Sequence, residues 1–254
     1  QLNRACGSSQ QAVHNSAQAI AAGDIDVAIS CGVEMMGRVA MGSDFSLDEE
    51  YSATFPFEFV HQGISAEMIA KKWDLTRREL DEFSAESHRK AAAATDAGWY
   101  RQEILPVTVA QNGEEAVVDR DEGIRSSIDP EKMASLRPVF QENGVITAGN
   151  SSQVSDGAAA LLLASESKAD EFGLRKRARI VGRVAVGSDP EFALTGPIPA
   201  THAILEKTGL SIEHMDAIEI NEAFASVVLA WVREIDPPMD RVNIQGGAIA
   251  HGHP

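Results

Sequence analysis

The sequence predicts a layered α/β protein, and three observations favour this class. Hydrophobic residues make up 44% of the 254-residue chain but aromatic residues only 6%, so small aliphatic side chains must fill most of the interior. A helical pattern near the start of the chain passes directly into a strand-like pattern. A second series of strand, helix and strand patterns occupies the last third of the chain. Because this alternation is typical of helices packed on parallel strands, we expect a parallel sheet.

Charge and cysteine content restrict the partners and the compartment. The chain has 22 Lys and Arg against 38 Asp and Glu, a formal net charge of −16, which disfavours binding to nucleic acid or to an anionic membrane surface. Two cysteines without a four-ligand Cys/His spacing argue against a disulfide framework and against a metal site. The longest apolar run, 157–164, is too short to cross a bilayer. We therefore expect a soluble cytoplasmic protein.

The first predicted elements are a helix and a strand. Apolar residues recur at helical spacing over residues 7–22, and Gly23 stands where a left-handed helix cap is expected. Residues 25–34 alternate apolar and small side chains, which predicts a buried strand in which Cys31 has a structural role. Cys6 then lies at the N-terminus of the helix.

The middle of the chain, residues 37–149, differs in character and is interpreted as an inserted lobe. A helical pattern covers 65–73, and a Thr-x-x-Glu sequence that begins at Thr76 predicts a capping box at the start of a second helix. Alternating residues on both sides of Asn112-Gly113 predict a β-hairpin.

Strand and helix patterns alternate through the rest of the chain. The predicted strands are 145–149, 158–164, 178–187, 217–221 and 241–245. One predicted helix ends near Gly209, and another covers 222–234.

The position of Cys6 favours a nucleophile. A helix N-terminus carries partial positive charge and free backbone N–H groups, so it favours the thiolate form of a nearby cysteine and can hold an oxyanion beside it. Gly7 leaves room for a substrate. The alternative is a buried cysteine that acts as a small hydrophobic residue. Position alone leaves the two interpretations equal.

Two later segments supply groups that complement a thiol. Asn221 lies where a predicted strand passes into a helix, a usual place for ligand-facing side chains, although an N-cap is the alternative. His251 and His253 lie in a glycine-rich segment from which an imidazole can reach into a cleft. We interpret His251 as a surface histidine. Cys6, Asn221 and His253 together supply a nucleophile, an orienting amide and a base.

Four phrases resemble, in order, the motifs of the thiolase family of acetyl-CoA acyltransferases: "NRACGSSQQAV", "GNSSQVSDGAAALLL", "INEAFAS" and "GGAIAHGHP". The resemblance implies an α/β thiolase fold with αβαβα layers, two similar halves and an inserted loop domain that binds coenzyme A. Residues 1–36 and 150–173 map to the N-terminal half, 37–149 to the loop domain and 174–254 to the C-terminal half. The N-terminal strands and a C-terminal segment with a second catalytic cysteine are expected to lie outside these residues.

The resemblance also implies roles for the three candidate catalytic residues. Cys6 would accept the acyl group, His253 would activate it and hold the thioester oxygen, and Asn221 would position a water in the same oxyanion hole. These roles imply ping-pong cleavage of 3-oxoacyl-CoA with CoA, or the reverse condensation of acetyl-CoA. Coenzyme A is then a substrate, no cofactor is needed, and the family implies a homodimer or homotetramer.

Five further residues are implied in substrate binding. Ser152 matches the family's pantetheine contact, and Arg125 matches a residue near the nucleotide end of CoA, with a solvated surface charge as the equal alternative. His61 and Gln62 would line the acyl pocket, where Gln62 replaces the usual methionine. Phe224, in the same motif as Asn221, is assigned to substrate binding.

Other classes remain open at this point. A β-ketoacyl synthase also acylates a cysteine at a helix N-terminus, although the motifs around Asn221 and His253 favour a thiolase. A noncatalytic CoA- or acyl-binding protein and a structural subunit of a fatty-acid oxidation complex are the nonenzymatic alternatives.

Overall fold

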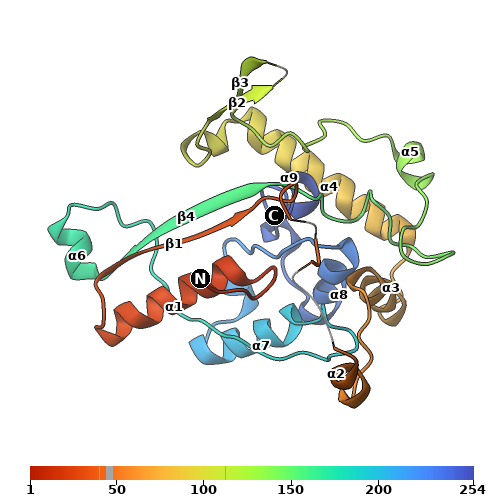
Figure 1. Cartoon of the computed structure of the whole chain (residues 1–254), viewed down its shortest axis with the longest axis horizontal. Helices are drawn as coiled ribbons and strands as arrows, with labels where there is room; N and C mark the ends of the chain where they lie inside the picture. Colours follow the sequence, from red (N-terminus) through yellow and green to blue (C-terminus); the bar gives the residue numbers. More distant parts are fainter. Residues whose placement is uncertain (40, 44–47, 112) are drawn as a thin grey trace. The chain divides into compact units, whose positions relative to one another are not determined.

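The computed structural model describes residues 1–39, 41–43, 48–111 and 113–254 (Figure 1). Contacts between residues divide the chain into two compact units. Unit 1 comprises Gln1–Ser46, Val154–Ala185 and Pro254, and unit 2 comprises Leu47–Gln153 and Val186–His253. The predicted division into two halves and a loop domain stays a prediction. No helix in the described part of the chain combines the length and the apolar character that a bilayer crossing requires.

Unit 1 is built on a two-stranded sheet. The helix α1 (Ser8–Ala22) contacts the sheet, which pairs β1 (Val27–Glu34) with β4 (Gly157–Ala164), and α6 (Glu166–Glu171) follows β4 (Figure 1). The strands are antiparallel, so the expected parallel arrangement is wrong for this pair. The reason is topological: the chain leaves β1 at Glu34 and re-enters β4 at Gly157, and these two residues are paired at the same end of the sheet.

Small residues on one face of β1 hold α1 against the sheet. The Ser30 hydroxyl donates to the carbonyl of Ala12 at 3.2 Å and lies 2.9 Å from the hydroxyl of Ser16. A Cβ atom at Gly32 would overlap the side chain of Ser9, so glycine allows the close approach.

The opposite face of β1 is exposed in unit 1. Ile29 and Val33 are 70% and 73% exposed, and Cys31 is exposed as well. The prediction of a buried strand is therefore wrong for this unit, and the structural role of Cys31 stays a prediction. The physical reason is that α1 covers only the face that carries Ser30 and Gly32.

Unit 2 is mainly helical. Its elements are α2 (Glu49–Thr54), α3 (Gln62–Lys72), α4 (Arg77–Asp96), η1 (Trp99–Gln102), β2 (Val107–Gln111), β3 (Glu114–Val118), α5 (Pro130–Ala134), α7 (Pro197–Thr208), η2 (Ile212–His214), α8 (Ala225–Ile235), η3 (Met239–Arg241) and α9 (Ala248–His251). The apolar α8 contacts α3, α4 and α7. Ile69 of α3, Leu80 of α4 and Ile249 of α9 are almost completely buried in the same core as α8.

Local sequence features form as predicted. The Thr76 hydroxyl accepts from the amide of Glu79, and the Glu79 carboxylate accepts from the amide of Thr76, which completes the capping box of α4. Gly23 and Gly209 end α1 and α7 with left-handed conformations, at φ of 82° and 68°. β2 and β3 form the predicted hairpin, although Asn112 of its turn lies outside the described residues.

Four of the predicted strands do not form as strands. Residues 145–149 make only the bridge Pro138↔Thr147. The strand pairing between residues 217–221 and 241–245 consists only of the parallel bridge Ile218↔Val242. Residues 178–187 adopt no regular structure. An alternating apolar pattern indicates a preference for the strand conformation. A strand forms only where an adjacent strand supplies hydrogen-bond partners for its backbone N–H and C=O groups.

Candidate active site

Asn221 and His253 are hydrogen-bonded to each other in unit 2. Phe224 occupies the N-cap position of α8, so Asn221 does not cap that helix. The half-buried imidazole of His253 follows α9, and its Nε2 lies 3.2 Å from Asn221 Nδ2. Because an amide nitrogen only donates, Nε2 accepts and the ring proton belongs on Nδ1. Burial lowers the pKa of His253, which keeps the ring neutral and able to take up a proton.

A buried carboxylate next to Asn221 organises this segment. Glu222 is 1% exposed and accepts hydrogen bonds from the Ser87 hydroxyl at 2.7 Å, Asn243 Nδ2 at 2.7 Å and the amide of Ile249 at 3.1 Å. These bonds connect α4 and the 241–245 stretch to α9, which leads to His253. We did not predict Glu222 from the sequence, although an acid within the largely apolar "INEAFAS" was the available clue.

Cys6 lies in unit 1, two residues before α1 begins at Ser8. The Ser8 hydroxyl accepts from the amide of Arg4 at 2.8 Å and donates to the carbonyl of Ala5 at 2.7 Å. Ala5 has a φ of 46°, a left-handed conformation that is uncommon for a residue with a Cβ atom. The turn before Cys6 is thus tight and fixed by Ser8, and the free thiol is exposed. We predict that the Cys6 thiol reaches the imidazole of His253, and this stays a prediction.

The ring of His61, at the N-cap of α3, is the first of three neighbouring rings. His61 Nδ1 accepts from the amide of Gly63 at 3.1 Å and caps the helix, and its ring lies 5.3 Å from that of Phe140. Phe140 is in turn 5.8 Å from Phe224, which is 7% exposed and belongs to the core of unit 2. The assigned substrate contacts of His61 and Phe224 stay predictions.

The other predicted binding residues occupy different surroundings in unit 2. The amide of Ser152 donates to the carbonyl of Ala223 at 2.9 Å, so this serine lies beside the segment that contains Asn221. Gln62 is exposed at the first residue of α3. Arg125 is also exposed, and its backbone amide donates to His88 Nδ1 at 3.2 Å.

His251 is not the surface histidine that we expected. Its Nδ1 lies 3.0 Å from a carboxylate oxygen of Asp121, and its Nε2 lies 3.0 Å from the carbonyl oxygen of Gln245 and 3.2 Å from the Tyr100 hydroxyl. The surface interpretation is wrong because the ring, at the end of α9, is enclosed by these polar groups.

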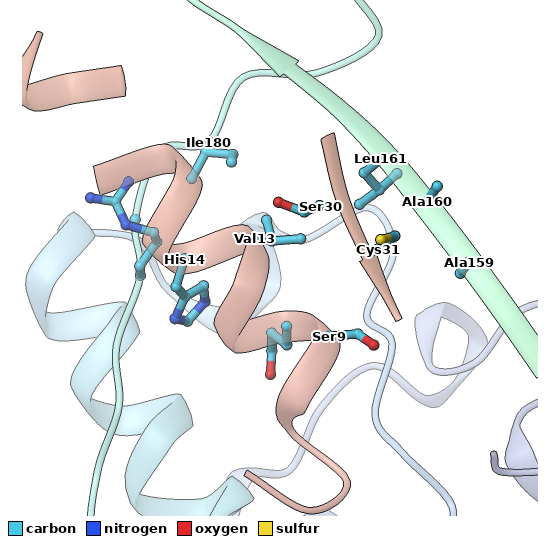
Figure 2. A pocket seen from close by; sticks show the side chains of 12 residues that line it. Ser9, Val13, His14, Ser30, Cys31, Ala159, Ala160, Leu161 and Ile180 are labelled. Atoms are coloured by element: carbon cyan, nitrogen blue, oxygen red, sulfur yellow. The ribbon is translucent and has the colours of Figure 1, made fainter. Parts of the chain in front are cut away.

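Unit 1 contains a largely apolar cavity of about 440 Å³. Figure 2 shows Val13 of α1, Cys31 of β1, Leu161 of β4 and Ile180 around it. Cys31, and not Cys6, is the cysteine that lines this cavity. Among the residues that the structure describes, no group of three or more His, Cys, Asp or Glu side chains could hold a metal ion.

Comparison with known families identifies the class of protein. The model described as "Thiolase, N-terminal domain" matches residues 1–167, and the model described as "Thiolase, C-terminal domain" matches residues 174–254. The chain therefore belongs to the thiolase family, as its four motifs indicated.

Individual relatives agree with this assignment. The steroid 3-ketoacyl-CoA thiolase FadA6 of Mycobacterium tuberculosis is 46% identical over 265 residues, which cover 100% of this chain and 64% of that protein. A 3-ketoacyl-CoA thiolase of Vibrio vulnificus is 45% identical over 258 residues, which cover 100% of this chain and 67% of the relative. The chain thus spans about two thirds of the length of these relatives.

A solved structure agrees with the fold. Human mitochondrial 3-ketoacyl-CoA thiolase matches with a TM-score of 0.88 and 35% identity, over 100% of this chain and 67% of that one. The predicted α/β thiolase fold is confirmed by this match.

Proposed function

We propose that the chain contains the acyl-accepting machinery of an acyl-CoA:CoA acyltransferase. The reaction is cleavage of a 3-oxoacyl-CoA with CoA, or its reverse, the condensation of acetyl-CoA, through an acyl group on Cys6. The names of the relatives, 3-ketoacyl-CoA thiolase and acetyl-CoA acetyltransferase, support this reaction class. The main structural support is the hydrogen bond between Asn221 and a neutral His253, which lie in two separate motifs of the sequence.

The chemistry follows from these groups. Once Asn221 Nδ2 releases it, His253 Nε2 takes the proton of the Cys6 thiol, and the thiolate attacks the C3 carbonyl of the substrate. The C2–C3 bond breaks, so the acyl group stays on sulfur and the two-carbon fragment leaves as the carbanion of acetyl-CoA. The thiol of free CoA then attacks the acyl-cysteine and releases the Cys6 thiolate, which takes its proton back from His253. The proton that acetyl-CoA gains balances the proton that the CoA thiol loses, and the resemblance assigns its delivery to a cysteine outside residues 1–254.

Substrate binding is proposed for five residues. Ser152 contacts the pantetheine arm, and the exposed guanidinium of Arg125 supplies positive charge for the nucleotide end in a chain of net charge −16. His61, Gln62 and Phe224 shape the acyl site. Coenzyme A acts as a substrate and no cofactor is included in the proposal. We also propose that the protein is a cytoplasmic homodimer or homotetramer.

The acyl-transfer half-reaction tests this proposal directly. In it, the Cys6 thiol exchanges with acetyl-CoA to give acetyl-Cys6 and free CoA, a step that requires no carbon acid. We expect intact-mass and peptide analysis to locate one acetyl group on Cys6. Cys6→Ser should abolish the adduct, and His253→Ala should slow its formation by about 100-fold or more, because a general base is lost.

Cys31→Ser is the matched control, since it removes the other exposed cysteine. It should acylate at the parent rate. Acylation of Cys31 instead of Cys6 would contradict the proposal. Binding of CoA without any adduct would replace it with a noncatalytic CoA-binding role.

A further inference from the structure

A short segment of unit 2, residues 121–125, is anchored at three points. The Asp121 carboxylate lies 3.0 Å from His251 Nδ1 on α9. The carbonyl of Gly123 accepts from Gln153 Nε2 at 3.1 Å. The amide of Arg125 donates to His88 Nδ1, on α4, at 3.2 Å. Two histidines therefore fix the two ends of the segment that contains Arg125.

The contacts of His251 require a proton on both ring nitrogens. Nδ1 faces the carboxylate of Asp121 and Nε2 faces the carbonyl of Gln245, and both of these groups only accept hydrogen bonds. The Tyr100 hydroxyl donates to the same Gln245 carbonyl at 2.7 Å, so towards Nε2 it offers a lone pair. The geometry is that of an imidazolium paired with a carboxylate.

The contact of His88 requires the opposite state. Its Nδ1 accepts the N–H of Arg125, so this nitrogen carries no proton and the ring is neutral. His88 is only 5% exposed. Burial, and then the positive charges of Arg125 and His251, lower the pKa of His88 to about 4. A cationic His251 thus helps to keep His88 neutral.

We propose that His251 and His88 are positioning residues that hold segment 121–125 in opposite protonation states, His251 as a cation and His88 as a neutral acceptor, and so place Arg125 for the nucleotide end of coenzyme A. This inference depends on the proposed function, because it assigns a purpose to Arg125. Neither histidine contacts substrate in the proposal, and both act through the backbone and side chains of the segment.

Opposite protonation states give a window of pH in which the segment is held. Burial opposes the charge of His251, but the hydrogen bonds to Asp121 and Gln245, together with the negative charges of Asp121 and Glu222, raise its pKa. The contribution of His251 is therefore complete below its ordinary pKa and is lost as pH rises through the raised value. The contribution of His88 is complete above its ordinary pKa and is lost as pH falls through about 4.

Several other groups face the two histidines and belong in any titration analysis. Burial and then three acidic groups, with Asp121 first among them, raise the pKa of Tyr100 to about 12, so its hydroxyl stays protonated in this window. Burial and the charge of Glu222 raise the pKa of Glu219, and His251 and Lys90 oppose that increase. The carboxylates of Asp121 and Glu222 are further charged groups that act on His251.

Binding of adenosine 3′,5′-bisphosphate, the nucleotide portion of CoA, tests the inference without catalysis. We expect Asp121→Asn, His251→Gln and His88→Leu each to raise its Kd about tenfold, since the first removes the charge of the acceptor that faces His251 and the other two remove an imidazole that fixes the segment. His88→Gln should largely restore affinity, because the side-chain carbonyl of glutamine can accept from the amide of Arg125. Asp119→Asn, which changes an exposed carboxylate in the preceding loop, is the matched control and should bind as the parent does.

Three further measurements separate positioning from general damage. Hydrogen exchange of the 121–125 amides should accelerate in Asp121→Asn but not in Asp119→Asn. Imidazole nitrogen shifts near pH 6 should show two protons on His251 and one on His88. Acylation of Cys6 by acetyl-N-acetylcysteamine, which lacks the nucleotide, should fall much less than nucleotide affinity does.

Three results would count against the two claims. Equal nucleotide affinity and equal exchange in Asp121→Asn and Asp119→Asn, or a neutral His251 near pH 6, would refute the positioning roles. Failure of the parent protein itself to bind the nucleotide would refute the proposed use of Arg125 in CoA binding.

Discussion

The two units differ in which side chains they bury. In unit 2 the Glu222 carboxylate is 1% exposed and has three donors, and Leu80 is completely buried in the same unit. In unit 1 the polar Ser30 is buried against α1, while Ile29 on the same strand is 70% exposed. The contrast shows that the burial of a side chain depends on which elements its unit contains, and not on the polarity of that side chain alone.

The largest expected effect comes from truncating matched apolar residues in the two units. Leu80→Ala in unit 2 should lower the free energy of unfolding by about 2–5 kcal/mol, because it leaves a cavity in a closed core. Ile29→Ala in unit 1 should change it by less than about 0.5 kcal/mol, because most of that side chain is already in water. Urea unfolding of both variants measures the difference. Equal costs would mean that Ile29 is covered in solution, and the contrast would then disappear.

A smaller effect is expected from the charge of Glu222. Glu222→Gln keeps the shape of the side chain but points an amide nitrogen at one of the donors that the carboxylate now accepts from, which should cost roughly 2–3 kcal/mol. Thermal unfolding measures this loss, and Glu206→Gln on the exposed surface of α7 is the control. A neutral outcome at position 222 would show that the buried network tolerates an unpaired donor.

The smallest effects concern helix caps, which both units contain. Thr76→Ala removes the capping box of α4 in unit 2 and should cost about 1 kcal/mol, whereas Thr76→Ser should cost little. Ser165→Ala at α6 in unit 1 should cost less, because its hydroxyl is 3.4 Å from the amide of Lys168. Urea unfolding of all three variants would show whether capping, unlike core burial, is similar in the two units.

Features that depend on a few neighbouring residues could be predicted from the sequence. The glycine cap of α1, the capping box at Thr76 and the hairpin formed by β2 and β3 all form as expected, because each is determined within one turn of chain. Strand pairing could not be predicted in the same way. β1 pairs with a strand that is more than 120 residues away, and its direction depends on where the intervening chain returns.

The candidate site likewise contains some features that the sequence predicted and others that depend on distant segments. The order of the motifs placed Asn221 and His253 in one site, and the structure brings them within hydrogen-bonding distance. Glu222 and the polar partners of His251 were missed, because a buried carboxylate and a surface carboxylate look alike in a sequence. Only the fold shows that donors from three separate segments meet at Glu222.

The side chain of Gln153 contributes to how firmly segment 121–125 is held. Its amide nitrogen has two hydrogens, and it lies 3.1 Å from the carbonyl of Gly123 and 3.0 Å from the carbonyls of both Ile249 and Ala250. When the segment swings outward, both hydrogens therefore keep partners on α9, and no buried donor is left unsatisfied. In the proposed positioning roles, the contacts of His251 and His88 therefore oppose opening of the segment more than this third anchor does.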